Sequence, residues 1–202
     1  MHLLTESVRS AAIFPLAGAK LLTLEALKKT DLEYTTVITG FFTDYYVPSI
    51  PSNMGPLTMI LDIPNNKAAI PGSGDVPVSF THTADVGRFA ASLLGLSAWP
   101  EESYIIGETL TLKEFVAVVE EAKGEKFDVV YDPVEKLEKG EVTELPGHRD
   151  LYAYMPREML QGFSAAVGLM FEKGYFDYSH AMRLTNVEAQ TVRQLVAQSW
   201  KE

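Results

Sequence analysis

Lys20 is the residue whose type and position could best support proton-transfer chemistry. It lies in Pro15–Lys29, a segment whose pattern predicts a helix, and at 3.6 residues per turn it shares a stripe with Leu16, Leu24 and Leu27. A lysine in an apolar stripe is unfavourable unless it is paired or faces a cavity. Lys20 is therefore a candidate general acid or base. The alternative is a side chain at the edge of the stripe whose ammonium group extends to solvent.

The segment that follows this helix could form a binding edge. Glu33–Ile38 is rich in β-branched and aromatic residues, which predicts a strand, and Thr39, Gly40, Phe41 and Phe42 come directly after it. A glycine at the carboxyl end of a strand lets the backbone approach a ligand closely, and the aromatic rings after it could wall a pocket. We expect this strand to be parallel, buried on both faces and covered by a helix on each side.

The order and spacing of these residues resemble a known family. Lys20, then Thr35 fifteen residues later, then the run Gly40–Phe42 is similar to the NmrA-like and isoflavone-reductase-like family of atypical short-chain dehydrogenases, which bind NADP(H). Thr83–Phe89 resembles a helix start in the same family. The resemblance runs over nearly the whole chain, but it corresponds only to the carboxyl-terminal two thirds of a family member.

The resemblance implies an NADP(H)-dependent oxidoreductase that acts on a small aromatic molecule. In such an enzyme Lys20 would exchange a proton with the substrate, and the nicotinamide would deliver hydride. The cofactor side of the site would be formed by Thr39, Gly40, Phe41 and Phe42. The substrate side would be shaped by Tyr45, Tyr46, Met54, His82 and Phe163.

Two other interpretations remain open. The chain could be a cofactor-sensing regulatory protein of the NmrA type, which binds a partner and catalyses nothing, or it could be a partial chain that is inactive alone. No Gly-x-Gly-x-x-Gly occurs, so the loop that holds a pyrophosphate is missing. We therefore expect the isolated chain to bind NADP(H) weakly or not at all. An unpaired strand edge and uncovered apolar faces should make it self-associate or require a partner chain.

The alternation of helices and strands predicts an α/β fold: a partial Rossmann-like parallel sheet with a smaller carboxyl-terminal α+β substrate subdomain. Residues 1–40 would be the remnant of an NAD(P)-binding Rossmann domain. Residues 41–202 would form the substrate subdomain, interleaved with the last Rossmann strands and helices. Further strands are expected near residues 57–61, 67–70, 76–81, 103–106 and 127–131. One further helix should begin after Thr83 as its N-cap, and two more should begin at the capping boxes Thr111–Glu114 and Thr185–Glu188. Another helix is expected over residues 156–173.

Several candidate residues also have a purely structural interpretation. His82 could face the substrate side of the site, but the favoured explanation for a histidine at this position is a hydrogen bond at the start of the helix that follows it. The proline-punctuated segment from Tyr45 to Pro56 is either a loop packed on the core or the wall of a substrate pocket. Phe163 lies in a helix that is apolar on most sides, which favours a core position.

Composition excludes other classes of function. A hydrophobic content of 47% supports a packed core, whereas a formal charge of −10, from 17 basic and 27 acidic residues, disfavours a nucleic-acid partner. The chain has no cysteine, its four histidines lie far apart, and none of its nine tyrosines starts a Tyr-x-x-x-Lys pair. We therefore expect no metal site and no ordinary short-chain dehydrogenase pair. The chain shows neither a basic signal-peptide start nor a run of ~20 apolar residues, so we expect a cytoplasmic protein without membrane contact.

Overall fold

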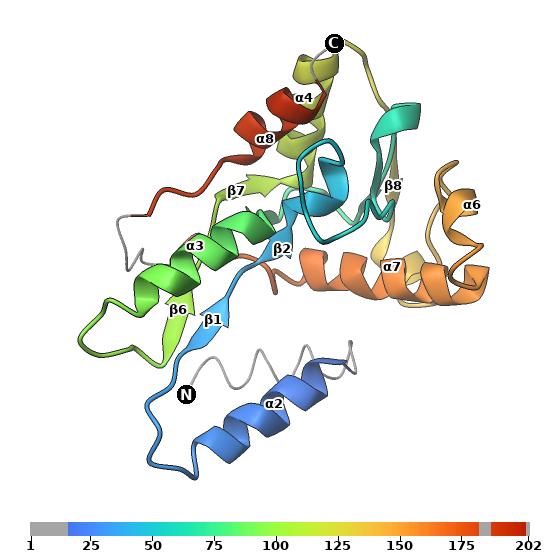
Figure 1. The fold of residues 1–202 in the computed structure, drawn as a ribbon. Helices are drawn as coiled ribbons and strands as arrows, with labels where there is room; N and C mark the ends of the chain where they lie inside the picture. The colour runs from blue at the N-terminus through green and yellow to red at the C-terminus, as the bar shows by residue number, and fades with distance from the viewer. Residues whose placement is uncertain (1–15, 182–186, 201–202) are drawn as a thin grey trace.

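The computed structural model describes residues 16–181 and 187–200, in which helices and strands alternate (Figure 1). The strands are β1 (Thr36–Ile38), β2 (Phe41–Phe42), β3 (Leu61–Asp62), β4 (Lys67–Pro71), β5 (Pro77–Thr81), β6 (Glu102–Tyr104), β7 (Glu108–Thr111) and β8 (Asp128–Asp132). The α-helices are α2 (Leu16–Leu27), α3 (Thr83–Leu93), α4 (Leu112–Lys123), α5 (Val134–Leu137), α6 (His148–Leu151), α7 (Arg157–Glu172) and α8 (Val192–Ser199). The 3₁₀ turns are η1 (Thr43–Tyr46) and η2 (Ile63–Asn65).

The strands form three small sheets, in the orders β1-β6, β2-β5-β7 and β3-β4-β8. Parallel pairs occur in each sheet: β1 with β6, β2 with β5, and β4 with β8. The helix α7 packs against α5 and β4, and α4 packs against α8. The predicted α/β fold with parallel strands is confirmed.

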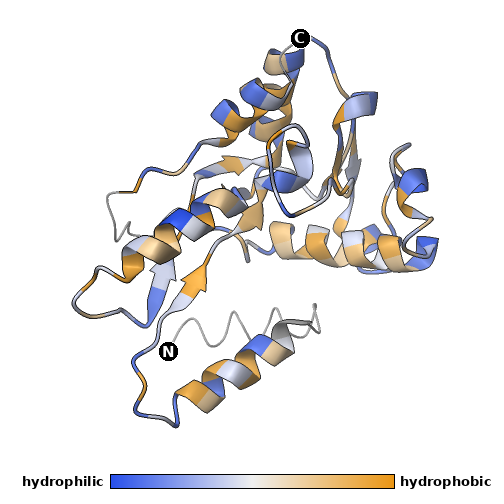
Figure 2. Cartoon of the chain, in the orientation of Figure 1, coloured by the Kyte–Doolittle hydropathy of each residue, from blue (hydrophilic) through white to orange (hydrophobic). Residues whose placement is uncertain are grey.

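The strand expected after the first helix is parallel but shorter than predicted. Only Thr36–Ile38 pairs, with residues 102–104 of β6. Before it, the carboxylate of Glu33 accepts the backbone N–H of Trp99 at 2.7 Å instead of taking part in a ladder. Val37 is 37% exposed, so one face of β1 is open and the prediction of burial on both faces was wrong. This pair lies at the end of the molecule nearest α2, and Figure 2 shows apolar residues along both α2 and β1.

The main core is organised around one aromatic ring. Phe41 is 8% exposed, and its ring centroid lies within 5.0 to 6.5 Å of five other aromatic rings. Aromatic edges and faces carry opposite partial charges, so the mostly edge-on contacts in this group add to the gain from burial. The five partners come from η1, β5, α7 and the segment after α7: Tyr45, Tyr46, Phe80, Phe171 and Phe176.

Of the expected helix caps within the described residues, one is confirmed and one is wrong by one residue. The capping box at Thr111 and Glu114 is confirmed, and α4 ends at Gly124 with φ +68°. The N-cap of α3 is His82 and not Thr83, because the imidazole Nδ1 accepts the N–H of Ala84. The expected capping box at Thr185 falls partly outside the described residues. The last helix begins later, at Val192, behind a capping box of Thr191 and Gln194.

Four aspartates are buried among the described residues, and three of them fasten loops outside the candidate site. Asp62 accepts the N–H of Gly147 at 2.7 Å, Asp85 accepts that of Gln190 at 2.9 Å, and Asp132 accepts that of Thr143 at 2.7 Å. A buried carboxylate is tolerated only when donors satisfy it, so each of these bonds fixes the position of a distant segment. The fourth, Asp44, belongs to the candidate site.

Across the described part of the chain, no helix is long and apolar enough to cross a membrane.

Candidate functional site

Gly40 joins β1 to β2, and its backbone presses against β5. Its φ is +67°, and a Cβ atom there would overlap the carbonyl oxygen of Ser79 and lie 2.9 Å from the carbonyl carbon. The left-handed backbone and the close approach both require glycine. The predicted close approach of backbone at this position therefore exists, but the group that is approached is a neighbouring strand.

The residues around Gly40 differ in accessibility. Thr39, Gly40 and Phe42 are half-buried, whereas Phe41 is a core residue. Phe42 pairs with Thr81 in the β2–β5 ladder. Of the four residues predicted to line a cofactor, Thr39, Gly40 and Phe42 keep partial access to solvent at the carboxyl end of β1.

Lys20 lies on α2 with an exposed side chain. Leu24 and Leu27 of the predicted stripe are half-buried, and the third half-buried leucine of the helix is Leu21. The covered stripe thus has Leu21 where Lys20 was expected, and Lys20 lies beside it. The structure does not bring the Lys20 side chain into the core.

Asp44 is the centre of a buried polar network beside the predicted substrate wall. It is 2% exposed, and its carboxylate accepts hydrogen bonds from the hydroxyls of Ser52 and Thr83 and, at 3.0 Å, from the N–H of Thr83. Burial raises the pKa of Asp44, but the hydroxyl and N–H donors of Ser52 and Thr83 outweigh burial and hold that pKa below its ordinary value of 3.8. The network ties η1 and the loop that carries Ser52 to the start of α3.

His82 is 1% exposed and lies between Asp44 and the first turn of α3. Its Nδ1 accepts the N–H of Ala84 at 3.2 Å, and its Nε2 lies 3.6 Å from Oδ1 of Asp44 without a hydrogen-bond partner among the described residues. The favoured explanation, a hydrogen bond at the helix entry, is confirmed.

The other predicted substrate residues divide into buried and half-buried groups. Tyr46 is 3% exposed, its hydroxyl has no hydrogen-bond partner in the described structure, and burial together with the charge of Tyr45 raises its pKa. Tyr45, Met54 and Phe163 are half-buried, and both Tyr45 and Phe163 pack against the main core. Burial and the charge of Asp44 raise the pKa of Tyr45.

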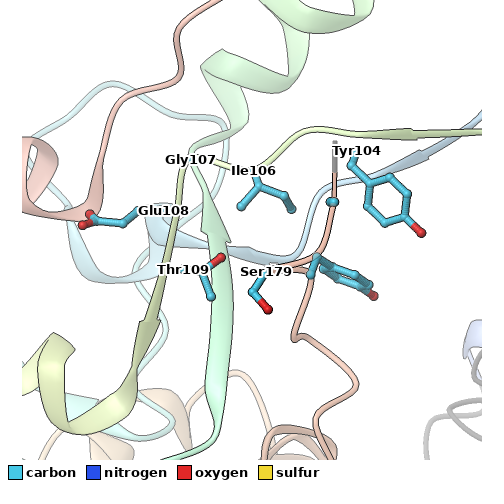
Figure 3. A pocket seen from close by; sticks show the side chains of 8 residues that line it. Tyr104, Ile106, Gly107, Glu108, Thr109 and Ser179 are labelled. Carbon is cyan, nitrogen blue, oxygen red and sulfur yellow. The ribbon is translucent and has the colours of Figure 1, made fainter. Parts of the chain in front are cut away.

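A pocket of about 160 Å³ lies at the carboxyl end of β6 (Figure 3). One wall is the connection from β6 into β7, and the other is the segment after Phe176. None of the residues proposed from the sequence lines it. Its signal in the sequence was weak, because Tyr178 and Ser179 lie far along the chain from Tyr104. The lining residues are Tyr104, Ile106, Gly107, Glu108, Thr109, Tyr178, Ser179 and Ala181.

No group of three or more acidic or histidine side chains is arranged to hold a metal ion within residues 16–181 and 187–200.

Comparison with known proteins gives matches in sequence and in structure. The protein named oxidoreductase BOA1 of Botryotinia fuckeliana is 33% identical over 163 residues, covering 80% of this chain and 50% of the relative. The protein named oxidoreductase swnN of Metarhizium robertsii is 31% identical over 153 residues, covering 70% and 45%. The chain thus spans about half the length of the curated relatives it matches. No protein-family model matches it.

Solved structures resemble this chain over nearly all of its length. Isoflavone reductase matches with a TM-score of 0.63 at 16% identity, covering 91% of this chain and 58% of the other. The chain has the isoflavone-reductase-like fold. Leucoanthocyanidin reductase of Vitis vinifera matches with a TM-score of 0.63 at 16% identity, covering 92% and 61%. Triphenylmethane reductase of Citrobacter sp., solved with NADP(H), matches with a TM-score of 0.65 at 18% identity, covering 92% and 60%. The resemblance predicted from the sequence is confirmed.

Replacing Gly40 by alanine is expected to destabilise this isoflavone-reductase-like fold by at least about 2 kcal/mol. A left-handed backbone costs an alanine about 1–2 kcal/mol, and the overlap with the Ser79 carbonyl adds to that. Gly87→Ala is the control: Gly87 lies in α3 with no atom within 4 Å of an added Cβ, so the change should stabilise by roughly 0.5–1 kcal/mol. Urea unfolding measures both. Equal effects of the two substitutions would contradict the close-approach argument.

The Asp44 network predicts a pH dependence of stability. A carboxyl whose pKa is lower in the folded than in the unfolded protein contributes stability above about pH 4, and this contribution disappears as the pH falls through the folded pKa. Asp44→Asn should therefore lower the free energy of unfolding at pH 6, with a difference from the unaltered protein that shrinks toward pH 3. Asp150→Asn, at an exposed position, should leave the curve unchanged. A pH-independent difference for Asp44→Asn would disprove the assignment.

Proposed function

We propose that this chain forms the substrate side of an NADP(H)-dependent oxidoreductase that acts on a small aromatic molecule. The observation that carries the proposal is the parallel pair β1–β6, whose carboxyl ends lead into the segment 39–42 and into the pocket after Tyr104. Ligands of open α/β sheets bind outside the carboxyl ends of parallel strands. The names of the two fungal relatives and the cofactor named with the Citrobacter structure support the same function.

The chain's own residues fit one end of a dinucleotide. Thr39, Gly40 and Phe42 keep partial access to solvent beside the carboxyl end of β1, which suits contact with a flat ring. Bound NADP(H) would supply hydride. The sequence has no Gly-x-Gly-x-x-Gly loop to hold the pyrophosphate, and residues 1–40 are assigned to a remnant of a dinucleotide-binding Rossmann domain. Residues 41–202 are assigned to the substrate subdomain.

Lys20 is proposed as the proton donor and acceptor of the reaction. Its side chain is exposed to solvent, whereas a lysine that exchanges a proton with a substrate has to lie against that substrate. The proposed role therefore requires additional structure packed over α2, where Leu22 is 74% exposed. The same packing would cover the open face of β1 that carries Val37.

The exposure of Lys20 also supports a second candidate, a non-catalytic cofactor-sensing protein of the NmrA type. Such a protein needs a nicotinamide site but no acid/base residue. Measured turnover separates the two, because a sensor binds the cofactor without oxidising or reducing a substrate.

The isolated 202-residue chain is expected to bind NADPH with a dissociation constant above about 1 mM, if at all, because it supplies contacts to the nicotinamide end only. It is also expected to self-associate through the uncovered β1 edge. Calorimetric titration with NADPH, combined with light scattering, measures both properties. Micromolar one-to-one binding by a monodisperse monomer would contradict the proposed division of the site.

In a protein that pairs residues 1–202 with a dinucleotide-binding half, Lys20→Ala should reduce kcat by roughly 10²–10⁴-fold, since that is the usual contribution of a positioned acid/base. Lys29→Ala removes another exposed lysine, just after α2, and should leave kcat unchanged. Unaltered turnover in the Lys20 variant would remove the catalytic assignment and leave α2 with a packing role.

A further inference from the structure

The two walls of the pocket at the end of β6 are both bonded to a single buried side chain, that of Ser79. Its exposed fraction is 0%, and its Oγ lies 2.8 Å from Oγ1 of Thr109 in β7 and accepts the N–H of Tyr178 at 3.1 Å. The backbone N–H of Ser79 also donates to the carbonyl of Phe176 at 2.8 Å. Because Oγ accepts from Tyr178, its hydroxyl proton can be donated to Thr109, so one side chain holds both walls.

The pocket has the size of a single ring. A cavity of roughly 150 Å³ in another protein holds benzene, and the pocket here measures about 160 Å³. The rings of Tyr104 and Tyr178 both line the pocket, and they are tilted against each other with centroids 5.6 Å apart. Such rings offer flat apolar area at little cost in side-chain entropy, which suits a flat ligand.

The chemistry of the lining favours an uncharged ligand. Glu108 is the charged residue among the lining residues, and in Figure 3 its side chain points away from Tyr104 and Ser179. Its carboxylate accepts the backbone N–H of Arg193 at 3.3 Å. The side chains that face the space between the walls are hydroxylic, aliphatic and aromatic, so neither an anion nor a cation would find a counter-charge there.

We propose that this pocket binds a small, uncharged, single-ring compound and that Ser79 is the positioning residue that keeps its walls at the required separation. The inference rests on the proposed function in one respect: it takes the bound compound to be the substrate of the oxidoreductase. Binding is measured in the absence of cofactor and turnover, so loss of the oxidoreductase proposal would leave the pocket assignment standing, and the reverse also holds.

Phenol is the probe, titrated into the full ¹⁵N-labelled chain and followed by amide chemical shifts. Saturable shifts are expected at Tyr104, Gly107, Thr109 and Tyr178. Ser79→Ala should weaken phenol binding by about 2- to 10-fold, since a hydrogen bond of this kind contributes about 0.5–1.5 kcal/mol. It should also speed amide exchange at Tyr178, whose N–H would lose its acceptor.

Ser103→Ala is the matched control. Ser103 is 1% exposed, and its Oγ lies 2.7 Å from Oγ1 of Thr35, so it forms the same type of hydroxyl pair but is not one of the residues that line the pocket. Both variants should lose similar stability, but only Ser79→Ala should change phenol affinity. Equal phenol affinity in the two variants would overturn the positioning role.

Ser179→Trp tests the pocket without risk to the core, because Ser179 is exposed. The indole should fill the space and abolish the phenol-induced shifts. Unchanged binding in this variant, or shifts that map elsewhere on the unaltered chain, would disprove the assignment of the site.

Discussion

The close approach of Gly40 to the backbone of Ser79 is the constraint on which the rest of the site depends. It lets β2 pair in parallel with β5, and this pairing places Phe41 beside Phe80 at the centre of the aromatic core. Ser79 is also the residue whose side-chain hydroxyl is hydrogen-bonded to both pocket walls, at Thr109 and at Tyr178. A side chain at residue 40 would push β2 away from β5, so the core and the pocket depend on one contact between backbones.

Buried carboxylates fix the positions of segments that lie outside helices and strands. Asp44 connects η1, Ser52 and the start of α3, and Asp85 connects α3 to the segment before α8. An ionised group that is removed from water must be satisfied by donors, so a displaced loop would leave a charge unpaired. The loops around the candidate site therefore have defined positions although much of their chain lies outside helices and strands.

The parallel pair β1–β6 is a two-stranded sheet with an open face. Parallel strands are normally covered on both faces, yet Val37 and the leucines Leu22 and Leu32 are substantially exposed at this end of the molecule. The relatives are about twice as long as the region of them that this chain matches. The exposure of Lys20 follows from the same open face.

The sequence by itself determined the features that depend on neighbouring residues. The helix around Lys20, the parallel strand before Gly40, the capping box at Thr111 and the family resemblance all arise from local spacing, propensity and backbone geometry. The glycine at residue 40 was recognised in the same way, although its neighbour was not.

Only the tertiary structure decided which side chains share a site. It placed Phe41 and Tyr46 in the core, and it brought Tyr178 and Ser79 together from residues 99 positions apart. Local patterns cannot identify such contacts, because the burial of a side chain and the partner of a hydroxyl depend on how distant segments pack.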